Sequence, residues 1–361
     1  MRARRGASEP GGLPTPVAAP QLDPELGLVL ADLGEEWRAP VTRENLAERQ
    51  RRDAASRPRP TAEGLRGDGL FEVDELCVPG PPAGGSDGEP GREPDGGPDV
   101  TLVSVRPAGL GGPLPLLYYL HGGAMVMGNA WSVLPRILRE WALPLGLAVI
   151  SVEYRLAPRT QYPGPLEDCY AGLSWAAEHA AELGIDADRI VIGGKSAGGG
   201  LAAALALLTR DRGGPVPLGQ LLLSPMLDDR GGTFSSRQLS GLDVWDLTSN
   251  ATAWQAALGD RYGAADLPGY AAPARATDLS GLPPAFVEVG SAEMFRDEGV
   301  AYANAIWQAG GQAELHVWSG ACHGFDGLAP KAALSQDARD ARTRWLRRLL
   351  TQSGTGDRPA Q

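Results

Sequence analysis

The sequence predicts an α/β fold in which a mostly parallel central sheet carries helices on both faces. Short apolar runs that resemble buried strands alternate with helical segments along most of the chain. One of these runs, LPLLYYL (114–120), is apolar enough to be buried on both faces of a sheet. The 49 glycines and 31 prolines are numerous enough to supply the turns between these elements.

Composition and charge limit the classes of function. The net charge of −11 argues against a nucleic-acid-binding surface, which needs a positive stripe. Cys77, Cys169 and Cys322 have neither paired nor metal-ligand spacing, so we expect a reduced cytoplasmic protein with no bound metal. No run approaches the roughly 18 apolar residues of a transmembrane helix, so we expect no membrane span. The sequence allows a homodimer.

Both ends of the chain are expected to lie outside the alternating core. Residues 1–21 are rich in proline, glycine and alanine, and we predict disorder there and in the tail 352–361. Two helices are expected within 22–60. The first follows Asp23, a residue type that caps helix N-termini, and the second is a highly charged helix over 41–56.

The core is predicted in two parts, 68–226 and 284–351, separated by an insertion at 227–283 that covers one end of the sheet. It opens with an alternating strand at 70–78 and a low-complexity, flexible loop at 79–98. Further strands are expected at 100–107, 114–120, 147–154, 189–194, 220–225, 285–290 and 313–318, and helices at 130–142, 165–181, 197–210, 296–309 and near the C-terminus.

The stretch GGKSAGGG (193–200) fits two motifs with different chemistry. A phosphate-binding P-loop would need glycine where the chain has Arg189, which argues against that motif. A nucleophile elbow, G-x-S-x-G, presents a serine between a buried strand and a helix and needs nearly side-chain-free residues two positions to either side. Gly194 and Gly198 meet that need. We therefore predict Ser196 as a catalytic nucleophile.

A second glycine motif, His121-Gly122-Gly123-Ala124, directly follows the strand LPLLYYL. Backbone N–H groups at glycines can approach a carbonyl oxygen closely, and α/β-hydrolases supply oxyanion donors from this position. The helix that begins at Ala197 offers another N–H and the positive end of its dipole. We predict an oxyanion hole formed by the N–H groups of Gly122, Gly123 and Ala197, with that of Ala124 as a further candidate.

The base is identified by its order in the chain. In α/β-hydrolases the acid and then the histidine follow the serine, which leaves His316 and His323 among the four histidines. His316 lies inside a predicted strand, where we expect a buried, hydrogen-bonded role. His323 lies in a glycine-flanked loop just past that strand and can reach Ser196. We predict His323 as the base.

The acid should follow the strand at 285–290. Glu293 is the first carboxylate past the strand end, which suits a side chain that orients His323. Asp297 is the alternative, although it and Glu298 also fit the first turn of the next helix, where acidic side chains complement the helix dipole. We predict Glu293 as the acid and keep Asp297 as the alternative.

Seven motifs occur in the order found in one branch of the α/β-hydrolases. They are LHGGAMVMG (120–128), EYRLAP (153–158), LEDCYAGLSW (166–175), GKSAGG (194–199), SPMLD (224–228), FRDEGVAYA (295–303) and HGF (323–325). Together they resemble the hormone-sensitive-lipase-like family, mostly bacterial carboxylesterases, over about residues 100–350. The resemblance implies an α/β-hydrolase fold, a helical cap built from the N-terminal helices and the insertion, and hydrolysis of short-to-medium acyl esters without a cofactor.

The resemblance assigns the same nucleophile, base and oxyanion donors as the motifs do, and the chain departs from it at three positions. The glycine motif ends in Ala124, Lys195 stands where the family often has Asp, Glu or Ala, and Glu293 stands where it usually has Asp. We interpret Lys195 as a charge-paired structural residue. Adjacent residues on a sharp elbow point apart, so its amine cannot lie beside the serine hydroxyl.

Several other residues are interpreted as structural or as possible pocket residues. Glu153 and Asp168 are taken as hydrogen-bonding scaffold residues and Cys322 as a packing residue. Five large side chains either line a substrate pocket or belong to the core: Met125, Met127, Trp131, Trp245 and Trp254. Two other functions stay open, a non-catalytic ligand-binding protein on this fold and an amide or peptide hydrolase that uses the same residues.

Overall fold

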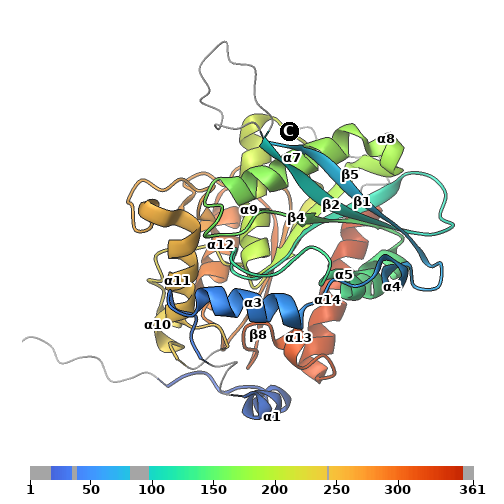
Figure 1. Ribbon diagram of the computed structural model, residues 1–361. Helices are drawn as coiled ribbons and strands as arrows, with labels where there is room; N and C mark the ends of the chain where they lie inside the picture. The colour runs from blue at the N-terminus through green and yellow to red at the C-terminus, as the bar shows by residue number, and fades with distance from the viewer. Residues whose placement is uncertain (1–17, 35–38, 82–96, 242–243, 353–361) are drawn as a thin grey trace, which may run out of the picture.

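Eight strands form one sheet in the part of the chain described by a computed structural model, residues 18–34, 39–81, 97–241 and 244–352 (Figure 1). Their order across the sheet is β1-β2-β4-β3-β5-β6-β7-β8. In chain order the strands are β1 (Phe71–Gly80), β2 (Gly97–Pro107), β3 (Leu114–Leu120), β4 (Ala148–Glu153), β5 (Ile185–Lys195), β6 (Gly219–Leu223), β7 (Ala285–Gly290) and β8 (Ala313–Trp318). β3 is buried along its whole length, as its apolar sequence predicts.

The sheet is parallel from β4 to β8 and antiparallel at the β1–β2 edge, which confirms a mostly parallel sheet. β1 and β2 form a long hairpin whose ladder ends with Gly80 opposite Gly97. The predicted bounds of the loop, 79–98, are therefore wrong at both ends, because backbone pairing extends β1 to Gly80 and β2 back to Gly97. Residues 82–96 lie outside the described residues.

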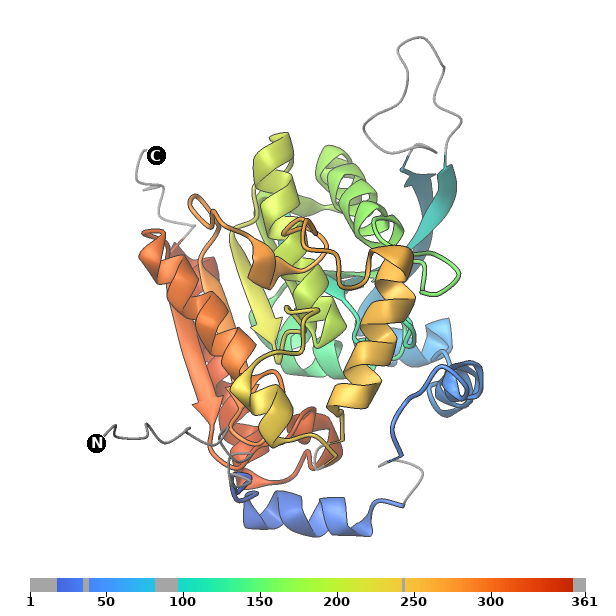
Figure 2. The same cartoon turned by 90° about the vertical axis from the view of Figure 1, so that its left-hand side faces the viewer.

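Helices cover both faces of the sheet. In chain order they are α1 (Pro24–Asp32), α3 (Leu46–Ser56), α4 (Ala62–Arg66), α5 (Leu134–Ile137), the π-helical turn η2 (Leu138–Ala142), α6 (Leu143–Leu145), α7 (Gly164–Glu178), α8 (Ala180–Leu183), α9 (Ala197–Arg212), α10 (Phe234–Gln238), α11 (Leu247–Leu258), the 3₁₀ turns η3 (Gly259–Arg261) and η4 (Pro273–Arg275), α12 (Arg296–Gln308), α13 (Phe325–Leu328) and α14 (Ala333–Gln352). On one face α7, α9 and α12 lie side by side (Figure 2) and bury Leu173, Leu205 and Ile306 against the sheet. On the other, η2 and α14 bury Leu138 and Trp345.

The helix expected at 130–142 begins later than the sequence pattern indicates. Asn129 Oδ1 accepts hydrogen bonds from the N–H groups of Trp131 and Ser132, at 3.1 and 2.9 Å. These bonds hold the chain in a turn, so regular helix starts only at Leu134 and then passes into the π-helical turn η2. A polar side chain that bonds its own following backbone competes with helix in this way.

The charged N-terminal helix also begins later than expected. Instead of starting at residue 41, α3 starts at Leu46, because Val41 is buried and donates its N–H to Ser249 Oγ of α11 at 2.9 Å. The preceding helix, α1, begins after Asp23 as predicted, and the Asp23 carboxylate accepts hydrogen bonds from two N–H groups of its first turn. Residues 1–17 and 353–361 lie outside the described residues, so disorder there stays a prediction.

The insertion at 227–283 contains α10, α11 and the 3₁₀ turns. Its longest helix, α11, contributes Trp254 to an apolar cluster that also includes Leu46 of α3 and Ala197 at the start of α9. Two helices that lie about two hundred residues apart in the sequence thus meet beside the end of β5. Within the described ranges, no helix combines the length and the apolar character needed to cross a membrane.

Candidate active site

Ser196 lies at a sharp turn between β5 and α9. Its backbone dihedral angles are φ 58° and ψ −122°, a region that residues with a side chain rarely occupy. The surrounding structure holds the turn, because the Ser196 N–H donates to the Leu223 carbonyl at 2.8 Å and its carbonyl accepts from the Met226 N–H at 3.0 Å. Strain of this kind persists only where neighbouring contacts fix it, and it is concentrated at functional sites.

The two glycines around Ser196 are required by close backbone contact. A Cβ atom on Gly194 would lie 2.3 Å from the Gly198 backbone, and one on Gly198 would lie 2.0 Å from the Leu120 carbonyl oxygen. Neither distance is compatible with a side chain. The strand, the turn and the helix can therefore close around Ser196 only with glycine at both positions, as the nucleophile-elbow hypothesis requires.

Replacing Gly198 by alanine should lower the free energy of unfolding by about 3 kcal/mol, the upper end of the usual overpacking cost, because backbone atoms rather than side-chain ends must move. Gly232→Ala is the matched control, since nothing lies within 4 Å of the added methyl group. That control should change the free energy by less than about 0.5 kcal/mol. Urea unfolding of both variants measures the difference, and equal stability of the two would contradict the close-contact argument.

His323 lies between Ser196 and Glu293. Its Nε2 is 3.1 Å from Ser196 Oγ, and its Nδ1 is 2.7 Å from Glu293 Oε2. Glu293 is fully buried, and its other oxygen accepts a hydrogen bond of 2.7 Å from the Gly290 N–H. Because an ionised carboxylate can only accept, this arrangement places the imidazole proton on Nδ1 and leaves Nε2 to accept from the serine hydroxyl. The structure thus brings all three predicted residues together.

The alternative acid, Asp297, lies away from this group. Its carboxylate accepts from the Ser235 N–H at 2.7 Å and pairs with Arg296 Nε at 2.8 Å, so it binds the N-terminal end of α10. The His323 ring instead packs against the edge of Phe295, with 5.0 Å between ring centroids. Of the two carboxylates considered, only Glu293 contacts His323.

Unpaired backbone donors lie beside the elbow. In the ranges that the structure covers, the N–H groups of Gly122, Gly123 and Ala197 donate to no protein acceptor, and the same holds for Ala124. Gly122 lies directly against the elbow, since a Cβ built on it would be 3.5 Å from Ser196 Cβ. Ala197 begins the 16-residue helix α9, whose dipole adds positive potential at this end. These N–H groups can therefore donate hydrogen bonds to a developing oxyanion.

His121 sits under the glycine loop and shapes it. Its Nδ1 donates to the Gly122 carbonyl at 2.8 Å, and its ring stacks on Tyr154 with 4.1 Å between centroids. The Tyr154 hydroxyl in turn donates to the His121 carbonyl at 2.7 Å. Burial lowers the pKa of His121 to about 4, so the ring is neutral at neutral pH.

This low pKa predicts a stability that depends on pH. Between pH 6.5 and 4 the unfolded chain takes up a proton at His121 and the folded protein does not, so stability falls as the pH falls through this window. The loss should approach about 3 kcal/mol, at 1.4 kcal/mol per pH unit. Relative to His121→Phe, which cannot titrate there, the wild-type free energy of unfolding should decline by that amount. Parallel stability curves for the two proteins would contradict the prediction.

Lys195 points away from Ser196 and is charge-paired, as expected. Its Nζ lies 2.5 Å from Oδ1 of Asp326, a buried carboxylate that also pairs with Arg136 and Arg342. Asp326 was not among the residues predicted from the sequence. It lies 131 residues from Lys195, and its three cationic partners come from β5, α5 and α14, so no local spacing signals the cluster.

The scaffold and packing interpretations are confirmed. Glu153 Oε2 accepts from the Ala130 N–H at 2.7 Å, and burial raises the pKa of Glu153. Asp168 is buried and accepts hydrogen bonds from both the guanidinium and the backbone N–H of Arg155, at 2.6 and 2.9 Å. Cys322 is buried in a small apolar cluster near α13.

The expectation for His316 is only partly right. It lies in β8 and bonds Glu314 Oε1 at 2.9 Å, but its side chain is 28% exposed rather than buried. The reason is topological, because β8 is the last strand of the sheet and one of its edges has no neighbour within the described residues. The ring stacks on Trp318 within the same strand.

The five large apolar side chains separate into two regions. Trp131 is core on the far face of the sheet, with the cluster that includes η2 and α14. The other four belong to or pack against the cluster that contains Ala197: Met125, Met127, Trp245 and Trp254. Met125 and Trp254 also line a small cavity of about 20 Å³ between α7, α9 and α11. The structure therefore places these four, and not Trp131, around the elbow.

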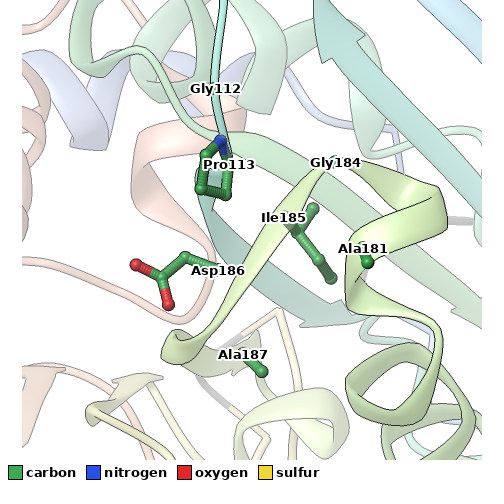
Figure 3. A pocket seen from close by; sticks show the side chains of 7 residues that line it. All are labelled: Gly112, Pro113, Ala181, Gly184, Ile185, Asp186 and Ala187. Carbon is green, nitrogen blue, oxygen red and sulfur yellow. The ribbon is translucent and has the colours of Figure 1, made fainter.

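A larger surface pocket lies at the opposite end of β5 from Ser196 (Figure 3). It has a volume of about 570 Å³ and is lined by Gly112, Pro113, Ala181, Gly184, Ile185, Asp186 and Ala187. Asp186 is its one ionisable side chain, and none of the predicted site residues borders it. We therefore do not assign the chemistry to this pocket. Over the part of the chain with described coordinates, no group of His, Cys, Asp and Glu side chains could hold a metal ion.

Comparison with known proteins agrees with the fold. A family described by the alpha/beta hydrolase fold matches residues 117–327. Carboxylesterase NlhH of Mycobacterium tuberculosis is 35% identical over 258 residues, which are 71% of this chain and 80% of that protein. Hormone-sensitive lipase of Ictidomys tridecemlineatus is 35% identical over 147 residues, 41% of this chain and 19% of that protein. A solved structure of a bacterial heroin esterase superposes with a TM-score of 0.80 at 37% identity, covering 91% of this chain and 98% of that one. The chain therefore belongs to the α/β-hydrolase family, in its hormone-sensitive-lipase-like branch of carboxylic ester hydrolases.

Proposed function

We propose that this carboxylic ester hydrolase cleaves short-to-medium acyl esters through an acyl-enzyme formed on Ser196, with His323 as the base and Glu293 as the orienting carboxylate. The observation that carries the proposal is the position of His323, which is 3.1 Å from Ser196 Oγ and 2.7 Å from Glu293 Oε2. A nucleophile, a base and a third group that orients the base are the arrangement that acyl transfer needs.

In the first half of the reaction, Ser196 Oγ attacks the ester carbonyl carbon and its proton passes to His323 Nε2. The imidazolium is stabilised by Glu293, which keeps Nδ1–H bonded to its carboxylate. The carbonyl oxygen becomes negative and is bound by the free N–H groups at the elbow and the glycine loop. His323 then gives its proton to the alcohol oxygen, the carbon–oxygen bond breaks, and the alcohol leaves.

In the second half, water attacks the acyl-enzyme carbonyl and gives its proton to His323 Nε2. Collapse of the second tetrahedral intermediate releases the carboxylic acid and returns the proton to Ser196 Oγ. The donors proposed for both intermediates are the N–H groups of Gly122, Gly123 and Ala197. Losing one such donor typically costs about 10²–10³ in rate, so their preorganisation is a large part of the proposed catalysis.

The residues around the elbow favour an ester substrate whose acyl group is uncharged. Ala197 shares an apolar cluster with Trp254, Met294 and Phe295, so a charged acyl chain would lose its hydration there. The nearby cavity of about 20 Å³ leaves little room for a long chain unless side chains move. The small cavity therefore favours short acyl chains over long ones.

We also propose that α3 and α11 form the cap over this site. Gln50 of α3 donates to the carbonyls of Val126 and Ala157, at 2.8 and 3.1 Å, and Asp53 accepts from the Gly128 N–H at 2.9 Å. These bonds attach α3 directly to the loop that carries the oxyanion donors. The cap would therefore contribute to the geometry of that loop as well as exclude water.

The proposal is tested with a fluorophosphonate probe and a panel of p-nitrophenyl esters from acetate to decanoate. We expect the probe to label Ser196, and kcat/KM to be highest at the short end of the panel. Failure to label Ser196 would favour a binding protein without catalysis. Faster turnover of a matched anilide than of the ester would favour amide hydrolysis. A maximum at decanoate would contradict the proposed chain-length preference alone.

A further inference from the structure

The residue next to the nucleophile is bound to the segment that carries the base. Neighbouring residues at the end of a strand point to opposite sides, so Lys195 projects beneath the elbow while Ser196 faces the site. There its Nζ is 2.5 Å from Asp326 Oδ1. Asp326 belongs to α13, three residues after His323, and a Cβ built on Gly324 or Gly327 would lie 3.9 Å from the same Nζ. Lys195 thus lies directly under the base loop.

Asp326 is the centre of a buried ion cluster. Its side chain is 1% exposed, and it pairs with Lys195, with Arg136 and with Arg342 Nη1, the last at 2.5 Å. Burial raises the pKa of Asp326, but the charges of Arg342, Lys195 and Arg136 outweigh it and hold the pKa well below its ordinary value. Asp326 therefore stays ionised and keeps its three partners across the working pH range.

The cluster also reaches the strand that leads to the acid. Arg342 bonds Glu288 of β7 through Nη2 at 2.5 Å and through Nε at 3.0 Å. Glu288 precedes Glu293 by five residues on the chain. One set of buried charges therefore connects the three segments that carry Ser196, Glu293 and His323.

The base loop needs such a restraint from outside. His323 is followed by Gly324 and preceded by Gly320, both with positive φ, so its own backbone is permissive on either side. The chain before His323 is held to β7's end by the Ala292 N–H, which donates to the Ala321 carbonyl at 2.9 Å. On the other side of His323, α13 is held by Phe325, which is buried in an apolar cluster, and by the buried ion pairs of Asp326.

We propose that Lys195 is a positioning residue that, through Asp326, holds His323 at hydrogen-bonding distance from Ser196. This inference rests on the proposed function, because it assumes that His323 is the base. A displacement of about 1 Å in such a site can cost about 100-fold in rate, so loss of this one contact should be visible in kcat. Substrate binding does not involve Lys195, so KM should change little.

Lys195→Met removes the charge and keeps the length of the side chain. Asp326 retains two arginine partners, so the variant should fold, whereas removing Asp326 would leave buried cations unpaired. We expect kcat to fall about 10- to 100-fold with KM within about twofold. Arg212→Met is the matched control, since it breaks the Arg212–Glu167 ion pair of 2.6 Å at the far end of α9 and should leave kcat unchanged.

A double-mutant cycle separates positioning from a general structural effect. On a His323→Ala background, Lys195→Met should cause no further loss, because the residue through which it acts is absent. An equal loss on both backgrounds, or unchanged kcat in Lys195→Met, overturns the inference. Full activity of His323→Ala alone would instead overturn the proposed function. If Lys195→Met does not fold, Lys195→Ala, which also removes the contact with Asp326, takes its place in the cycle.

Discussion

Ser196→Ala is expected to lower kcat for a p-nitrophenyl acyl ester by about 10⁶-fold. The reason is that the acyl-enzyme can no longer form, while His323 and the backbone donors stay in place. The rate should not fall to that of water, because oxyanion donors and binding alone retain about 10³–10⁴-fold over the uncatalysed reaction. KM should change little, since the hydroxyl contributes mainly to the transition state.

The measurement is a steady-state assay with an active-site titration, which excludes traces of wild-type protein. Ser235→Ala is a useful control, because Ser235 is buried and its hydroxyl donates to the Met294 carbonyl at 2.8 Å rather than to His323. That variant should lose stability and keep its kcat. Wild-type turnover by Ser196→Ala would refute the assignment of the nucleophile.

Glu293→Gln is expected to lower kcat by about 10³–10⁴-fold although it changes one atom. The Gly290 N–H needs an acceptor, so the glutamine oxygen should stay where Oε1 is now and its NH₂ group should face His323 Nδ1. That nitrogen would then have to accept, which moves the imidazole proton to Nε2. His323 Nε2 would then have no free lone pair to take the serine proton. The imidazolium form of His323 would also lose the negative charge of Glu293 that stabilises it.

Asp297→Asn is the matched comparison, because Asp297 was the alternative acid in the sequence. It bonds Ser235 and Arg296 rather than His323, so kcat should stay within about twofold and only a modest loss of stability should follow. A larger loss of kcat in Asp297→Asn than in Glu293→Gln would show that Asp297, and not Glu293, is the acid.

Local chemistry explains why much of this site can be identified from the sequence. Gly194 and Gly198 are dictated by backbone contacts of 2.3 and 2.0 Å, which no other residue type allows, so the elbow has a fixed short pattern. The glycine loop after β3 is similarly local. Chain order leaves His316 and His323 among the four histidines, and the glycine-flanked loop after the strand favours His323. The strands and the helices packed on them are predicted because their apolar periodicity is set by burial against one sheet.

Other features depend on segments that only folding brings together. Sequence order favoured Glu293 over Asp297 after the same strand, but the contact of Glu293 with His323 depends on the loop of His323 approaching the end of β7. The late start of α3 depends on a hydrogen bond between Val41 and Ser249 across 208 residues.

The sequence by itself determined the α/β architecture through its alternating apolar runs, and it pointed to the elbow and the proposed base through patterns a few residues long. Only the tertiary structure decided what Lys195 does. A lysine before the serine carries no local signal of its role, because its partner Asp326 is 131 residues away and is held by arginines from two further helices. Buried charges must be paired wherever in the chain their partners lie, so an ion cluster of this kind becomes visible only once the segments have packed.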